Sequence, residues 1–141
     1  MDLAVRTGGC LCGTVRYSVR GEPVHVGRCH CTDCRRESGS AFTVYAQWPV
    51  EDFEVSGEIV SYHGRGFCPR CGSRLLNPPE AGDGLVEVRI GTLDDAPFAL
   101  TPDAELWVKA PGESDGPCNG GPQAGAWWAS YALGLGKLAT E

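Results

Sequence analysis

The stretch Cys29-His30-Cys31-Thr32-Asp33-Cys34 decides how this chain can fold, because it places three thiols within six residues. Four more of the eight cysteines form two pairs, Cys10 with Cys12 and Cys68 with Cys71. Structural zinc sites bind the metal through four Cys or His ligands, whereas catalytic zinc sites keep three protein ligands and one exchangeable position. The two pairs together therefore match a closed site, and the triplet matches an open one.

The two cysteine pairs have spacings that suit one shared zinc ion. In an extended C-x-C segment, residues i and i+2 point to the same face, so the thiols of Cys10 and Cys12 can approach one metal. In Cys68-Pro69-Arg70-Cys71-Gly72, proline fixes one turn angle and glycine permits a left-handed exit, which makes a tight turn. The alternative, that Cys10 and Cys12 are small buried hydrophobic residues, fits their glycine-flanked segment poorly. We predict a structural zinc on Cys10, Cys12, Cys68 and Cys71.

The triplet predicts a second, open zinc site on Cys29, Cys31 and Cys34. Three thiolates leave the complex with a net charge of about −1, which makes the zinc a weak Lewis acid and favours binding of another thiolate over activation of water. The alternative is a second structural site with a fourth protein ligand. The candidates for that ligand are Cys118, His30, His25 and His63.

Basic and small polar residues surround the triplet. Arg28, Arg35 and Arg36 either offset the thiolate charge or hold the carboxylates of a ligand, which arginine does with bidentate geometry. Ser38-Gly39-Ser40 offers hydroxyls and backbone N–H groups to an anion, or simply ends a helix. The candidate substrate-binding residues are therefore Arg35, Arg36, Ser38, Gly39 and Ser40.

The composition predicts one small, mostly β domain with many loops. The 141 residues include 20 glycines and 10 prolines, and runs such as Thr14–Arg20 alternate apolar and polar residues. Further strands are expected over 24–28, 41–48 and 85–90. A short helical turn capped by Thr32 or Asp33 should end at Gly39. The net charge of −6 argues against a nucleic-acid partner, which needs a basic surface.

The chain lacks an apolar signal sequence at its start and an apolar run long enough to span a membrane. We therefore expect a cytoplasmic protein, where cysteine clusters more often hold metal than form disulfides. The segment 111–125 is rich in Gly, Pro and Ser and is expected to be flexible, and 126–133 is a candidate short helix. We divide the chain into a zinc-binding domain, 1–109, and a C-terminal extension, 110–141.

The motifs, in order, resemble the glutathione-dependent formaldehyde-activating family (GFA, also called centromere protein V-like). They are Gly9-Cys10-Leu11-Cys12-Gly13-Thr14-Val15-Arg16-Tyr17, Cys29-His30-Cys31-Thr32-Asp33-Cys34-Arg35-Arg36 with Ser38-Gly39-Ser40-Ala41-Phe42, Phe67-Cys68-Pro69-Arg70-Cys71-Gly72-Ser73, and Gly91-Thr92-Leu93-Asp94-Asp95. The resemblance covers about residues 7–109. It implies a zinc-bound fold like the Mss4-like group, with small β-sheets and hairpins, a structural zinc on the two pairs and a catalytic zinc on the triplet.

The resemblance also implies an activity and a substrate. The family's named reaction is the addition of glutathione to formaldehyde, which gives S-hydroxymethylglutathione, and it is classed as a carbon–sulfur lyase. The arginines and Ser38-Gly39-Ser40 would then hold the peptide carboxylates of glutathione. The chain departs from the family pattern after about Lys109. The alternative function is a non-enzymatic zinc module that binds another protein, and a redox role for the triplet fits the ligand count less well.

Overall fold

The computed structural model describes residues 3–79, 83–95 and 100–106 of the chain. Within these ranges it contains ten strands, one α-helix and two short 3-10 helices. These elements are β1 (Val5–Gly9), β2 (Arg16–Arg20), β3 (His25–Cys29), α1 (Thr32–Ser38), β4 (Thr43–Pro49), η1 (Val50–Asp52), β5 (Phe53–Ser56), β6 (Val60–Tyr62), β7 (Arg65–Phe67), β8 (Arg74–Asn77), β9 (Leu85–Arg89), η2 (Ile90–Thr92) and β10 (Ala104–Leu106).

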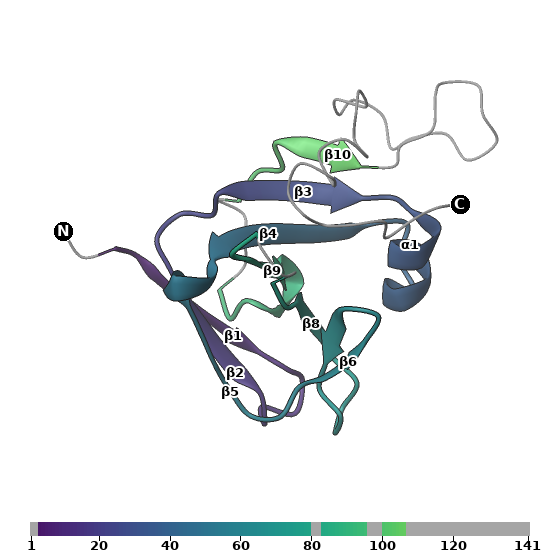
Figure 1. The fold of residues 1–141 in the computed structure, drawn as a ribbon. Helices are drawn as coiled ribbons and strands as arrows, with labels where there is room; N and C mark the ends of the chain where they lie inside the picture. The colour runs from purple at the N-terminus through teal and green to yellow at the C-terminus, as the bar shows by residue number, and fades with distance from the viewer. Residues whose placement is uncertain (1–2, 80–82, 96–99, 107–141) are drawn as a thin grey trace.

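The strands form two sheets (Figure 1). The smaller sheet has the order β1-β2-β5, and the larger has the order β10-β3-β4-β9-β8-β7-β6. Within the described ranges, the strand pairs are antiparallel except β10 with β3, which is parallel. The predicted mostly β fold is therefore confirmed. No described helix is both long enough and apolar enough to cross a lipid bilayer.

The hydrophobic core lies where β2 packs against one face of the larger sheet. Tyr17 and Val19 are buried while Arg16 and Arg20 are exposed, as the alternation in this segment predicts. Their partners in the core include Trp48, Val86, Val88 and Leu75, all with no exposed surface. Burying a Val or Leu side chain stabilises a fold by about 1.5–3 kcal/mol, so this cluster is what holds the two sheets together.

The opposite face of the larger sheet is polar although it is buried. Because side chains alternate along a strand, Thr43, Tyr45 and Gln47 of β4 point away from Trp48. Glu87 and Arg89 of β9 pair with Gln47 and Tyr45 and lie on the same side. This polar face begins at the triplet, because the Cα of Thr43 pairs with that of Cys29 at the end of β3.

One expected detail is wrong, and one strand was not expected. The N-cap of α1 is Cys31, whose sulfur accepts a hydrogen bond from the backbone N–H of Cys34, and not Thr32 or Asp33. Strand β1 was missed because two glycines weaken its strand pattern. Gly8 is required there, since a Cβ would lie 2.4 Å from the ring of Tyr17.

Candidate metal centres

The first cluster combines residues from two distant turns. Cys10 and Cys12 lie between β1 and β2, and Cys68 and Cys71 follow β7. The four sulfur atoms all lie within 4.8 Å of one another. The Sγ–Sγ distance is 3.5 Å between Cys10 and Cys12 and 3.8 Å between Cys12 and Cys68. Sulfurs bound to one tetrahedral Zn²⁺ lie about 3.8 Å apart, so this cluster could hold such an ion.

Hydrogen-bond donors surround the first cluster and favour thiolates. The backbone N–H of Val15 lies 3.3 Å from the sulfur of Cys10. The hydroxyl of Ser73 lies 3.2 Å from the sulfur of Cys71 and lowers the pKa of that thiol to about 5. The same hydroxyl accepts a hydrogen bond from the N–H of Leu11 at 2.9 Å, which ties the two turns together. Donors of this kind are typical of the outer shell of a metal site.

The triplet is formed where β3 meets α1. Cys29 ends β3, Cys31 caps the helix and Cys34 lies in its first turn. All three are buried, and their sulfurs lie within 4.8 Å of one another. Hydrogen bonds from the thiols of Cys29 and Cys34 lower the pKa of Cys31 to about 3, and the proximity of Cys31 raises the pKa of Cys29. These contacts favour a thiolate at Cys31, and the triplet could also hold a metal ion.

Among the described residues, the triplet group contains three ligand atoms and no histidine. The Nδ1 atom of His25 pairs with Asp103 at 2.5 Å, and the rings of His30 and His63 lie against neighbouring aromatic rings. Cys118, the other candidate for a fourth ligand, lies outside the described residues. The open character of this site stays a prediction.

A network of buried charges fixes the helix that carries Cys34. The carboxylate of Glu37 contacts Arg65 at 3.0 Å, Arg74 at 3.1 Å and Arg89 at 2.6 Å. These three arginines come from β7, β8 and β9, so the network binds α1 to the larger sheet. Arg89 also interacts electrostatically with the thiol of Cys34. The sequence did not predict this network, and its signal there is one arginine in each of three short strands.

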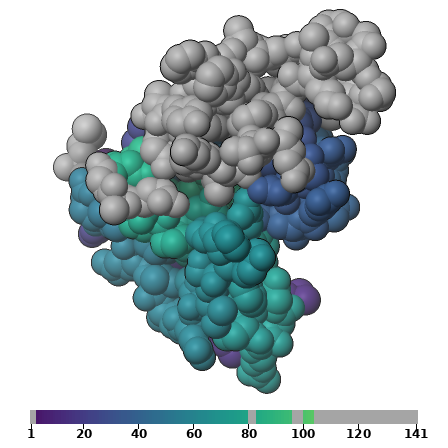
Figure 2. All heavy atoms as spheres, turned by 45° about the vertical axis from the view of Figure 1, so that its right-hand side comes forward, coloured from purple at the N-terminus to yellow at the C-terminus, as the bar shows by residue number. Residues whose placement is uncertain are grey.

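Arg36, one of the predicted substrate residues, is exposed and lines a hollow of about 510 Å³ between α1 and the β6–β7 hairpin. These two segments lie side by side on one face of the molecule (Figure 2). Within the described ranges Arg36 has no ion-pair partner. The other residues that line the hollow are Asp33, Glu37, Tyr62, His63 and Arg65.

Of the other predicted substrate residues, Arg35 lies in the middle of α1, where its guanidinium is 3.5 Å from the hydroxyl of Thr32, and Ser38, Gly39 and Ser40 lie at the end of the helix. Gly39 has φ = 66° and donates its N–H to the carbonyl of Arg35 at 2.9 Å. The hydroxyl of Ser38 donates to the carbonyl of Cys34 at 2.7 Å and accepts from the N–H of Ser40 at 3.1 Å. These polar groups therefore terminate α1, and their predicted role in substrate binding stays a prediction.

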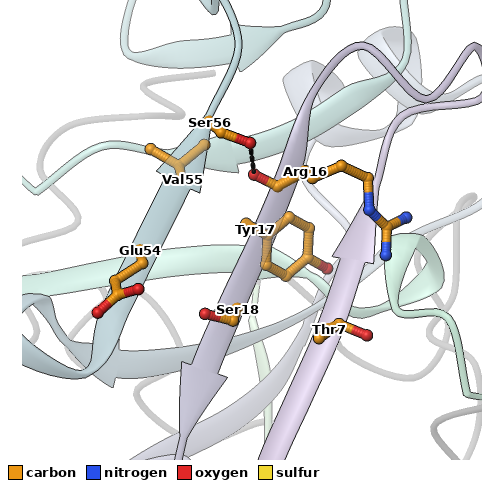
Figure 3. A pocket seen from close by; sticks show the side chains of 7 residues that line it. All are labelled: Thr7, Arg16, Tyr17, Ser18, Glu54, Val55 and Ser56. Carbon is orange, nitrogen blue, oxygen red and sulfur yellow. Dashed lines mark hydrogen bonds between the residues drawn. The ribbon is translucent and has the colours of Figure 1, made fainter.

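A second hollow, of about 310 Å³, lies on the smaller sheet (Figure 3). The guanidinium of Arg16 forms an ion pair with Asp94, which also accepts a 2.6 Å hydrogen bond from Thr7. These contacts lower the pKa of Asp94 to about 2. The residues that line this hollow are Thr7, Arg16, Tyr17, Ser18, Glu54, Val55 and Ser56. They include no thiol, and the Arg16–Asp94 pair joins β2 to the segment after η2.

A mostly β domain with one cluster of four thiols and one of three defines a cysteine-rich class of protein whose thiol clusters could hold metal ions. The family model described as glutathione-dependent formaldehyde-activating enzyme matches residues 5–110. The chain therefore belongs to this family, as the sequence motifs predict.

A solved structure supports the fold. The crystal structure of a Rhodobacter sphaeroides protein matches with a TM-score of 0.51 and 21% identity, and the match covers 68% of this chain and 96% of that one. At this level of identity the likeness shows the fold alone.

The C-terminal part of the chain has a different similarity. The family model for glycosyl hydrolases family 6 matches residues 91–139. Endoglucanase A of Cellulomonas fimi is 65% identical over 37 residues, 26% of this chain, and a probable exoglucanase of Podospora anserina is 66% identical over 32 residues, 21% of this chain. The chain spans 8% of the length of each of these curated relatives. Sequence analysis did not recognise this similarity, and its predictions for 111–125 and 126–133 fall outside the described residues.

Proposed function

We propose that this chain is a zinc-dependent carbon–sulfur lyase that acts on a thiol–aldehyde adduct. The reaction is the interconversion of glutathione plus formaldehyde with S-hydroxymethylglutathione, or that of a related thiol and carbonyl pair. The observation that carries the proposal is the group of three buried thiols within 4.8 Å of one another, in a chain of the formaldehyde-activating family. Three thiols leave one tetrahedral position for a fourth thiolate.

The two clusters have different roles in this proposal. Cys10, Cys12, Cys68 and Cys71 hold a structural zinc, and Cys29, Cys31 and Cys34 hold the catalytic one. A zinc ion at the triplet supplies positive charge that stabilises a substrate thiolate. The chain supplies a rigid corner between β3 and α1, held by the Glu37 network, in which the three thiols are kept out of water.

The hollow beside α1 supports glutathione as the thiol. Arg36 presents an exposed guanidinium to it, and guanidinium groups bind carboxylates with bidentate geometry. Arg36 follows Cys34 by two residues, so its side chain leaves the opposite side of the helix, and the two groups are separated by about the width of a helix, roughly 10 Å. An extended tripeptide also spans about 10 Å, so a peptide thiol bound across α1 would place its sulfur near the triplet and a carboxylate near Arg36.

The free cysteines and the acidic net charge are consistent with a cytoplasmic enzyme that acts on a small molecule. The seven described cysteines are free, as expected in a cytoplasmic protein. The net charge of −6 favours a small-molecule substrate over a nucleic acid.

Zinc content and exchange kinetics test the function together. The purified chain should contain two zinc ions, of which mild chelation removes one more easily, and should accelerate exchange between free formaldehyde and its glutathione adduct in an NMR assay. Cys31→Ser should abolish this acceleration while the first zinc stays bound, whereas Cys118→Ser should retain both zinc ions and the full rate. Two equally resistant ions and an unaccelerated exchange would instead support the non-enzymatic, protein-binding alternative.

A further inference from the structure

The phenol of Tyr45 lies on the polar face of the larger sheet, close to the triplet. Its side chain is 1% exposed, and its ring passes over Gly27 of β3, where a Cβ would lie 2.5 Å from the phenolic oxygen. The hydroxyl lies within electrostatic reach of the thiols of Cys29 and Cys34. Burial raises the pKa of Tyr45, so the phenol keeps its proton at neutral pH. A buried proton carrier therefore lies beside the candidate catalytic cluster.

From the hydroxyl of Tyr45, a line of polar contacts continues through His25 and Asp103 toward solvent. The phenolic oxygen of Tyr45 lies 3.5 Å from Nε2 of His25, and Nδ1 of His25 lies 2.5 Å from Oδ1 of Asp103. The carboxylate fixes a proton on Nδ1, which leaves Nε2 as the acceptor for the phenol. Hydrogen bonds of catalytic groups are often long without substrate and shorten when it binds.

Asp103 is held in place by the backbone of β3. Its N–H donates to the carbonyl of Val26 at 2.8 Å, and its Oδ2 accepts from the N–H of Val26 at 3.3 Å. The side chain of Asp103 is 56% exposed and that of His25 is 13% exposed. The line therefore runs from a buried phenol through a largely buried imidazole to a carboxylate in contact with water.

The neighbours of Tyr45 on the same face of β4 also indicate a polar occupant. The hydroxyl of Thr43 and both amide atoms of Gln47 are buried, and none of them has a hydrogen-bond partner within the described parts of the chain. Buried polar groups are nearly always paired with protein or with ordered water. Water or a polar ligand beside Tyr45 would satisfy them.

We propose that Tyr45, His25 and Asp103 form a proton relay that serves the thiol triplet. This inference rests on the proposed lyase function. In the addition direction the substrate S–H bond breaks, the phenolic oxygen takes that proton, and the original phenolic proton moves to Nε2 of His25. The imidazolium so formed is stabilised by Asp103.

The same relay then returns the proton. The thiolate sulfur forms its bond to the carbonyl carbon, and the π electrons of the C=O bond move to the oxygen. That oxygen takes the phenolic proton of Tyr45 while Nε2 of His25 gives its proton back to the phenolic oxygen. The thiol proton is replaced by one on the product hydroxyl, both side chains return to their starting states, and no other reactant is needed.

Removal of the hydroxyl tests the relay in the full-length, zinc-loaded chain. Proton transfer by a positioned side chain contributes about 10²–10⁴-fold to a rate, so Tyr45→Phe should lower kcat about 100-fold or more with little change in the KM for glutathione. The solvent deuterium isotope effect on kcat should change as well. The matched control is Tyr17→Phe. Tyr17 lies in the smaller sheet, is also buried, and has its hydroxyl hydrogen-bonded to Thr92 of η2.

A second readout does not depend on activity. The chain has three histidines, and the ¹⁵N signals of His25 can be identified by comparison with His25→Gln. The relay predicts a proton on Nδ1 of His25 and an unprotonated Nε2 whose ¹⁵N signal shifts in Tyr45→Phe but not in Tyr17→Phe. A His25 that carries its proton on Nε2 at neutral pH would overturn the relay whatever the activity.

The outcomes separate the relay from the proposed function. An active wild type in which Tyr45→Phe is as fast as Tyr17→Phe overturns the relay and leaves the lyase function intact. An inactive wild type whose His25 has the predicted protonation and responds to Tyr45→Phe overturns the lyase function, while the proton-carrying line of Tyr45, His25 and Asp103 is supported.

Discussion

Glu37 and Arg89 are joined by a 2.6 Å contact between a carboxylate oxygen of α1 and a guanidinium nitrogen of β9, although 52 residues separate them. Their side chains are 11% and 9% exposed. Arg89 also acts on the thiol of Cys34, so the contact couples the position of the helix to the charge of the triplet. An ion-pair network between α1 and the larger sheet therefore holds the helix that carries Cys34 in the candidate catalytic site.

Replacing Glu37 should weaken both the fold and the second metal site. Glu37→Gln leaves three neighbouring arginines without their shared carboxylate, and removal of one partner of a buried ion pair costs about 3 kcal/mol. We expect a loss of that order in the free energy of urea unfolding and weaker zinc binding at the triplet, measured by competition with a chelator. The control is Glu58→Gln, an exposed residue before β6. Equal zinc affinity in the two variants would show that the network does not position Cys34.

The first cluster should be needed for folding. Its sulfurs join the turn after β1 to the turn after β7, so a zinc ion there would close a long loop and contribute to folding directly. We expect Cys10→Ser to contain one zinc ion in place of two and to melt about 10 °C or more below the wild type. Metal analysis and circular dichroism measure the two effects. A Cys10→Ser protein with two zinc ions and an unchanged Tm would contradict the structural role of this cluster.

Asp94 should stabilise the fold only above a low pH. Its pKa is about 2 in the folded protein, below the ordinary value of 3.8, because Arg16 and Thr7 hydrogen-bond to the carboxylate. The ionised group therefore stabilises the fold above about pH 4, and this contribution disappears as the pH falls toward 2. The difference in Tm between wild type and Asp94→Asn should be constant near pH 6 and shrink below pH 4. A difference as large at pH 2.5 as at pH 6 would assign the effect to something other than ionisation.

Local spacing and the cysteine count predicted which thiols lie together. The C-x-C and C-x-x-C segments place thiols on one face or across one turn, and the structure brings Cys10, Cys12, Cys68 and Cys71 together as expected. The alternation around Tyr17 and Val19 likewise predicted which face of β2 is buried. The alternation and the spacing within each pair depend on neighbours in the sequence, whereas the joining of the two pairs was predicted because a structural zinc takes four ligands.

The contacts of the residues around the triplet could not be predicted from local sequence patterns. The sequence of β4 does not show that Tyr45 lies on a polar face, because both faces of this strand are buried. His25 meets Asp103 only because β10 pairs with β3 in one particular parallel register. Glu37 gathers three arginines from three strands. Each of these contacts depends on sheet order and register, which arise from the packing of the whole chain.

Arg36 should set the affinity for a carboxylate-bearing thiol. A hydrogen bond to a charged group contributes about 1.5 kcal/mol or more, so Arg36→Ala should raise the KM for glutathione at least about tenfold and leave kcat almost unchanged. A thiol without carboxylates, such as 2-mercaptoethanol, should be handled equally by both proteins. Arg70→Ala, an exposed arginine beside the other cluster, is the control. An equal rise in KM for both thiols would place the carboxylate elsewhere.

Gly27 should be required for the position of Tyr45. A Cβ at residue 27 would lie 2.5 Å from the phenolic oxygen of Tyr45 and 3.1 Å from Nε2 of His25, so Gly27→Ala must push the phenol away from the imidazole. Overpacking of this kind costs about 1–3 kcal/mol, which the folded state should tolerate. We expect a folded protein with two zinc ions and a kcat that falls nearly as far as in Tyr45→Phe. Combining Gly27→Ala with Tyr45→Phe should then recover only part of the lost stability, since loss of the hydroxyl removes the 2.5 Å contact but leaves Cζ 2.7 Å from the added Cβ. The rate should not recover, because the phenylalanine ring carries no proton. If the fold loss of kcat in the double variant equals the product of the two single losses, Gly27 and Tyr45 act independently.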